Sequence, residues 1–89
     1  MLRVTSEAND YLRQVREARG FEPTAGARFV RSPGGIGLTF ASAPAPGDQI
    51  LTAKELPLYI PDDLAAALAW AIIDVTRENG NPKLVLRPQ

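Results

Sequence analysis

The first third of the chain shows the spacing of an amphipathic helix. Apolar residues recur three and four positions apart, which places them on one helix face; they are Ala8, Tyr11, Leu12, Val15 and Ala18. Charged residues, among them Arg16, fill much of the remaining circumference. Thr5 and Ser6 offer N-cap hydroxyls, and Gly20 is typical of the residue that ends a helix. We therefore predict a helix over about residues 6–19.

The next segment alternates between apolar and other positions, as half-buried strands do. Residues 27–31 alternate roughly, and Ile36, Leu38 and Phe40 alternate with small or polar residues. Between these two segments, residues 32–35 read Ser-Pro-Gly-Gly, which is a strong turn signal. We predict a β-hairpin around these glycines.

Three more short segments are predicted as strands: residues 2–4, 49–53 and 57–60. Ile50 and Tyr59 are the expected anchors of the last two, with Lys54 and Glu55 as the turn between them. A proline-rich break at residues 44–48 precedes them, and it is too short to be a domain linker.

The last third predicts a second helix and a final hairpin. Pro61 and two aspartates suit a first helical turn, and Leu64, Leu68 and Ala71 share a stripe, with Trp70 late in this helix. Strands are expected at residues 72–77 and 83–87, and the pair Asn79-Gly80 favours a tight turn between them. The predicted order is β-α-β-β-β-β-α-β-β, an α+β chain that is mostly β.

Size and charge restrict the class of protein. The chain has 89 residues, which suits a single domain over residues 1–89. Ten basic residues balance ten acidic ones, so we expect no nucleic-acid partner. The most apolar stretch, residues 64–73, is about half the length that spans a bilayer, and the N-terminus has no signal-peptide pattern. We therefore expect a cytoplasmic protein with no membrane contact.

The sequence contains neither cysteine nor histidine. This composition excludes disulfides, thiolate chemistry, zinc sites of the Cys/His type and cysteine-held iron–sulfur clusters. It also removes the usual general base and the usual activator of a serine nucleophile. Lys54 and Lys83 follow no Ser-Lys signature. We therefore expect no enzyme, no catalytic residue, no metal ligand and no cofactor.

Two motifs resemble ligand-binding sites, one for an anion and one for a metal ion, but their chemistry does not favour binding. The Pro33–Gly37 segment resembles an anion-binding glycine loop, but it leads into a strand and lacks the phosphate-loop lysine, so a tight hairpin with positive φ is favoured. Asp62 and Asp63 are adjacent, and neighbouring helical residues point about 100° apart. They therefore suit a helix N-terminus better than a metal site.

Charge and aromatic placement suggest an interaction surface. The first 31 residues carry an excess of arginine, whereas residues 32–74 carry five acids and one lysine. This asymmetry would guide an acidic partner or head-to-tail self-association, although a solvated face is the favoured interpretation. Trp70 is either a core residue or part of an interface.

Several phrases of the sequence, taken in order, resemble the HesB/IscA-like family, the A-type carriers of iron–sulfur cluster assembly. The clearest is the Ser-Pro-Gly-Gly-Ile-Gly-Leu-Thr-Phe run at residues 32–40, where the family has a cluster-ligating cysteine before an apolar strand. Residues 43–48, 58–60, 68–75 and 83–88 match later phrases. The resemblance covers nearly the whole chain. It implies a compact mixed β-sandwich or pseudo-barrel with two helices.

The departures from the family bear on function. The family's first cysteine aligns with Gly35, and its C-terminal Cys-Gly-Cys pair would fall beyond Gln89. The family's turn before its Ile-Asp strand, which usually contains Asp-Gly, is replaced by residues 69–71. The resemblance therefore implies the fold without cluster carriage.

We interpret the chain as a small interaction or scaffold domain that holds no iron–sulfur cluster. The alternatives are an accessory protein of cluster assembly that acts through partner binding, and a small-molecule binding module. The expected partner is another protein, a second copy of the chain, or both. The candidate interaction residues are Gly34, Gly35, Ile36 and Trp70.

Overall fold

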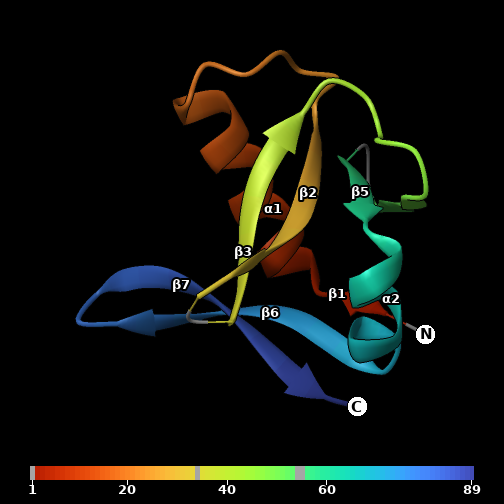
Figure 1. The fold of residues 1–89 in the computed structure, drawn as a ribbon. Helices are drawn as coiled ribbons and strands as arrows, with labels where there is room; N and C mark the ends of the chain where they lie inside the picture. The colour runs from red at the N-terminus through yellow and green to blue at the C-terminus, as the bar shows by residue number, and fades with distance from the viewer. Residues whose placement is uncertain (1, 34, 54–55) are drawn as a thin grey trace.

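The computed structural model describes residues 2–33, 35–53 and 56–89. Within them lie two helices and seven strands in the predicted order (Figure 1). The elements are β1 (Arg3–Val4), α1 (Ser6–Ala18), β2 (Gly26–Ser32), β3 (Gly35–Ala41), β4 (Gln49–Ala53), β5 (Leu56–Ile60), α2 (Asp62–Leu68), β6 (Ala71–Glu78) and β7 (Asn81–Pro88). Gly34 and the predicted turn at Lys54 and Glu55 lie outside the described residues.

The strands form two mixed sheets. One has the order β3-β2-β5-β4 and the other the order β1-β6-β7. β2 runs parallel to β5 and β1 runs parallel to β6, whereas the other neighbours are antiparallel. The described strands close no barrel, so the two-sheet version of the predicted architecture is the one observed.

Helix α1 begins and ends close to the predicted positions. The Thr5 hydroxyl accepts a hydrogen bond from the Ala8 N–H at 3.1 Å, and Gly20 follows the helix with φ +76°. The prediction was wrong for Arg16, which is buried. Arg16 lies four residues after Leu12 on the packed face, and its guanidinium donates to the Ala25 carbonyl at 2.9 Å. That bond gives the buried guanidinium a hydrogen-bond acceptor.

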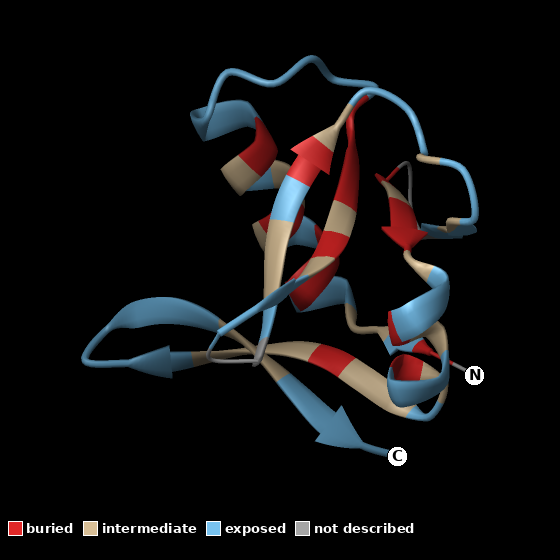
Figure 2. Ribbon diagram, in the orientation of Figure 1, coloured by how far each residue is buried: buried red, intermediate tan, exposed pale blue. Residues whose placement is uncertain are grey.

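The core lies between the four-stranded sheet and the helices (Figure 2). Tyr59 is buried as predicted, but the expected anchor Ile50 is 59% exposed. β4 is an edge strand, and Ile50 stands opposite Tyr59 whereas Leu51 stands opposite Leu58. Leu58 is a core residue, so its neighbour Leu51 is the β4 side chain that packs against the core.

Helix α2 is shorter than the sequence pattern predicts. It ends at Leu68, and Ala71 already belongs to β6. The residues after Leu68 form a strand because two neighbouring strands pair with them: Ile72 pairs with Arg3 of β1 and with Arg87 of β7. Tertiary pairing therefore overrides the helical preference of the alanine-rich run. Trp70 lies in the turn between α2 and β6 rather than within the helix, which corrects its predicted place.

The two glycine-containing hairpins form where they were predicted. Asn79 and Gly80 have φ of 52° and 81°, the left-handed pair that a type I′ turn requires. β2 and β3 pair in a continuous antiparallel register that ends at Ser32 opposite Gly35. Gly35 thus begins β3 directly after the turn. Among the described residues, no helix has both the length and the apolar character needed to cross a membrane.

Candidate interaction surface

Two of the predicted interaction residues meet on the surface. Ile36 and Trp70 line one shallow depression together with Leu86, which the sequence analysis did not single out. We call these three side chains the apolar surface. Gly35 directly precedes Ile36 at the start of β3, and Gly34 lies outside the described residues. The remaining lining residues are Ala67, Leu68, Ala71, Arg87 and Pro88.

Three different elements position the apolar surface. Ile36 comes from the edge strand β3, Trp70 from the α2–β6 turn and Leu86 from the edge strand β7. Trp70 is 73% exposed and Leu86 is 45% exposed, and with Ile36 they form one contiguous exposed apolar patch. Ile36 is exposed to 36%. The three side chains therefore come from three segments that are separated in the sequence.

Leu86 shows how the sheet register produces exposure. It stands opposite Ile73 in the β6–β7 ladder, so the two side chains project from the same face of the sheet. Ile73 is 1% exposed because it belongs to the core, whereas Leu86 projects from the outer strand of the pair. Leu84 and Leu86 are two residues apart in a strand, so the sequence alone indicates that they share a face. Their distance from the core depends on the tertiary arrangement.

The end of the chain fixes the backbone beside Trp70. The Gln89 N–H donates to the Trp70 carbonyl at 3.1 Å, and the Gln89 side-chain amide donates to the Ala71 carbonyl at 3.4 Å. These bonds hold the last residues of β7 against the α2–β6 turn. The backbone that carries Trp70 is therefore hydrogen-bonded to the end of β7.

Charged groups near the apolar surface are paired. The Arg87 guanidinium donates to Asp74 at 3.2 Å, and Asp74 also accepts from the Thr5 hydroxyl at 2.9 Å. The Val75 N–H, 2.8 Å from Asp74 Oδ1, is the main reason that the pKa of Asp74 is lowered. Thr5 and Arg87 lower that pKa further, and burial opposes them.

A second ion pair lies near Ile36. Arg31, which stands opposite Ile36 in the hairpin, donates from Nε to the Asp63 carboxylate at 2.8 Å and from a terminal nitrogen to the Asp63 carbonyl at 3.0 Å. The contact joins the end of β2 to the start of α2. Asp62 and Asp63 occupy the first turn of α2, as predicted.

The side chains of the apolar surface do not fit an iron–sulfur cluster. Such clusters are held by thiolates or, in some sites, imidazoles, and the chain has neither residue type. Among the described residues, no three acidic side chains gather into a group able to hold a metal ion. Hydrocarbon and indole groups stand there instead, and their chemistry is suited to burial against another apolar surface.

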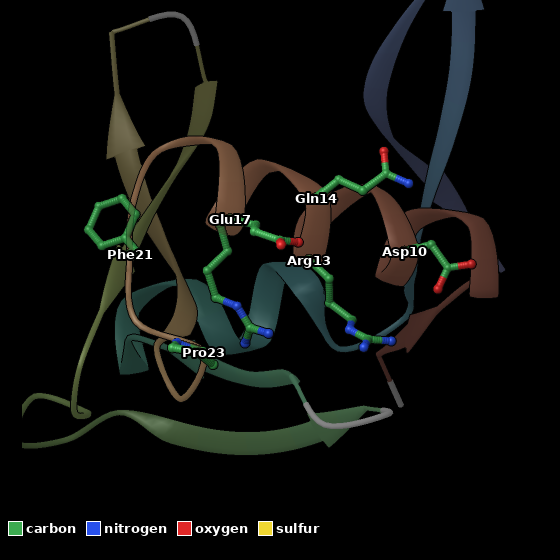
Figure 3. Close-up of a pocket in the computed structure, with 7 residues that line it drawn as sticks. Asp10, Arg13, Gln14, Glu17, Phe21 and Pro23 are labelled. Atoms are coloured by element: carbon green, nitrogen blue, oxygen red, sulfur yellow. The ribbon is translucent and has the colours of Figure 1, made fainter.

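A larger depression of about 440 Å³ lies along the second half of α1. Figure 3 shows Phe21 and Pro23 toward one end, Asp10 toward the other, and Arg13 and Glu17 between them. Its charged residues include both signs, and the guanidinium of Arg16, which also lines it, is bound to the Ala25 carbonyl. This mixture favours no single class of ligand.

Comparison of the chain with protein-family profiles gives no match, and a search of curated protein sequences gives none either. Several solved structures are similar, among them three that cover 98% or more of this chain. Escherichia coli SufA, involved in the biosynthesis of iron–sulfur clusters, matches with a TM-score of 0.80 at 21% identity, over 98% of this chain and 84% of its own.

The structure of IscA with a [2Fe-2S] cluster matches with a TM-score of 0.77 at 17% identity, over 99% of this chain and 85% of its own. A protein from Aquifex aeolicus, solved by NMR, matches with a TM-score of 0.80 at 17% identity, over 99% and 91% of the two chains. The expected architecture is therefore confirmed: this chain has the HesB/IscA-like fold, and it has that fold without a cysteine.

Proposed function

We propose that this chain is a small protein-interaction or scaffold domain that holds no iron–sulfur cluster of its own. The observation that carries the proposal is the exposed cluster of Ile36, Trp70 and Leu86. It is neither an enzyme nor a nucleic-acid or membrane binder in this proposal, and it acts in the cytoplasm on a protein partner.

The energetics of the apolar surface support binding. A buried aromatic side chain removes roughly 150–250 Å² from water, and each Å² of apolar area is worth about 25 cal/mol. Trp70 alone therefore offers several kcal/mol before the costs of association are subtracted. Tryptophan is also enriched among the residues that dominate binding energy at protein interfaces.

An accessory role in iron–sulfur cluster assembly is the second candidate. The observation that favours it is the fold shared with SufA and IscA over nearly the whole chain. In this version the chain contacts an assembly protein through the apolar surface while another protein supplies every cluster ligand. Without cysteine and histidine, this chain has no thiolate or imidazole with which to hold an iron–sulfur cluster.

The experiment has two arms. Anaerobic reconstitution with iron and sulfide should leave the protein colourless, and a reproducible stoichiometric cluster with charge-transfer absorption would contradict the proposal. Cross-linking pull-downs from cytoplasm should then compare the parent with Trp70→Ala and with Ile50→Ala.

Ile50 is the matched control because it is also large, apolar and exposed but lies on β4. Capture of a defined partner should be lost with Trp70→Ala and kept with Ile50→Ala. Equal capture by both variants would show that the apolar surface is not the interface.

A further inference from the structure

Strand β7 has a free edge. In the order β1-β6-β7 it is the outer strand, and among the described residues no other strand pairs with its far side. Each residue of an antiparallel edge strand directs its N–H and C=O either to its neighbour or away from it, and the two kinds alternate. The register of the β6–β7 ladder therefore decides which groups of β7 are free.

Two observations fix that alternation. The two-residue turn at Asn79 and Gly80 makes Glu78 and Asn81 the closing pair, which in such turns is hydrogen-bonded. At the far end, the Gln89 N–H donates to the Trp70 carbonyl at 3.1 Å. Gln89 lies eight residues after Asn81, an even number. Both residues therefore direct their backbone groups toward β6, and the two observations predict the same alternation.

Four residues of β7 consequently direct their backbone groups outward: Pro82, Leu84, Leu86 and Pro88. The two prolines have no N–H. The N–H groups of Leu84 and Leu86 are therefore the donors that this edge offers, with a proline beyond each of them. The edge is thus limited to a short window next to the apolar surface.

The window is poorly suited to a second copy of β7. In a two-fold antiparallel pairing with Leu84 opposite Leu86, Lys83 would stand opposite Arg87 of the other copy, and directly opposed like charges destabilise a sheet. Shifting the register brings Pro82 opposite Leu86, or Pro88 opposite Leu84. Because proline has no N–H, either shift leaves the carbonyl of the leucine opposite it without a hydrogen-bond donor.

We infer that the β7 edge accepts an extended segment of a different protein, in which apolar residues alternate with acidic ones. The acidic residues would stand opposite Lys83 and Arg87, which project from one face of the sheet and remain more than half exposed beside their own partners, Glu78 and Asp74. The apolar residues would lie on the other face, beside Leu84 and Leu86. The inference rests on the proposed function, since it specifies how a protein partner binds.

A synthetic peptide tests the inference directly. The probe is acetyl-Gly-Glu-Val-Thr-Val-Glu-Gly-amide, titrated into isotope-labelled protein while amide shifts are followed by NMR. Shifts should concentrate at residues 83–87 and around Trp70. The same peptide with both glutamates replaced by lysine should bind at least several-fold more weakly, because the charges are then alike. Shifts confined to other parts of the chain, or no binding by either peptide at millimolar concentration, would overturn the inference.

Two variants of one residue separate backbone pairing from side-chain contact. Leu86→Pro removes an outward N–H and keeps the ladder to β6, as Pro82 and Pro88 already do at equivalent positions. It should bind the peptide about tenfold more weakly, because the peptide carbonyl opposite residue 86 loses its hydrogen-bond donor. Leu86→Ala keeps the N–H and should lose less. Equal binding by Leu86→Pro and Leu86→Ala, with both folded by NMR, would overturn strand addition.

The remaining outcomes distinguish this inference from the proposed function. If Trp70→Ala abolishes capture of the protein partner while Leu86→Pro captures it as well as Leu86→Ala does, the interaction surface stands and strand addition fails. Sedimentation addresses a second copy: a dimer that Leu86→Pro abolishes would show that β7 pairs with itself and would overturn the inferred occupant. A parent that stays monomeric while binding the acidic peptide supports it.

Discussion

The two sheets of this molecule differ in what covers them. The four-stranded sheet contributes six residues to the buried core cluster: Ala27, Phe29, Phe40, Leu56, Leu58 and Ile60. The three-stranded sheet contributes Ile73, and most of β7 is exposed (Figure 2). Most of the buried core therefore comes from the four-stranded sheet, whereas the three-stranded sheet carries the β7 edge and part of the apolar surface.

Substitution of equivalent leucines should give the largest contrast between the sheets. Leu58→Ala in β5 removes a fully buried side chain and should lower the free energy of unfolding by about 2–5 kcal/mol. Leu86→Ala in β7 should change it by roughly 0.5 kcal/mol, as exposed positions usually do. Urea unfolding followed by circular dichroism measures both. Similar losses would show that the three-stranded sheet is as important to stability as the other.

The junction of β2 and β5 should tolerate no added methyl group. A Cβ at Gly26 would lie 2.6 Å from the Tyr59 ring and 2.8 Å from the Pro57 carbonyl oxygen. Gly26→Ala should therefore cost about 1–3 kcal/mol through overpacking. Gly37→Ala in β3 is the matched control, because its Cβ would meet Val30 at an ordinary 3.4 Å. Equal thermal unfolding midpoints for the two variants would contradict this prediction.

Removal of the Thr5 hydroxyl should weaken the connection between α1 and the three-stranded sheet. That hydroxyl caps the helix through the Ala8 N–H and donates to Asp74. Thr5→Ala should cost about 1–2 kcal/mol, and Thr5→Ser should retain most of the stability. Chemical denaturation of the three proteins gives the comparison. A Thr5→Ser variant as unstable as Thr5→Ala would assign the effect to the methyl group.

Acid should weaken the three-stranded sheet through Asp74. The pKa of Asp74 is lowered from its ordinary value of 3.8, chiefly by the Val75 N–H. The folded state thus favours the ionised carboxylate, so this stabilisation is complete above about pH 5 and is lost as pH falls through 3.8 and below. Asp74→Asn should make the thermal unfolding midpoint depend less on pH in that range. An unchanged slope below pH 4 would show that Asp74 does not contribute.

Local signals in the sequence predicted the order of elements and the positions of the two glycine-containing hairpins. Thr5, Gly20 and the Asn79-Gly80 pair act through neighbouring backbone geometry, which a sequence displays directly. The misplaced end of α2 has a different cause. Ala71 joins β6 because β1 and β7 pair beside it, and those strands lie far away in the sequence.

The candidate surface was predictable in part. The sequence marks Ile36 and Trp70 as interaction residues, because one follows the hairpin glycines and the other is a tryptophan among alanines, and the structure places both beside one depression. Leu86 and Ile50 were not predictable as exposed, since exposure depends on which strands form the edges of each sheet. Arg16 was placed on the wrong side because its acceptor, the Ala25 carbonyl, lies in a loop without a sequence signature.

The parallel pairing of β1 with β6 has a consequence for how the protein is made. Thr5 and Asp74, which hydrogen-bond to each other, are 69 positions apart, so the ribosome releases β1 long before its partner strand exists. All four strands of the larger sheet lie between residues 26 and 60, and they can pair while the chain is still growing. Contacts between distant residues form slowly because a long loop must close first. Synthesis from the N-terminus therefore imposes an order on folding, in which β1 is made before the larger sheet but pairs with its partner after that sheet can form.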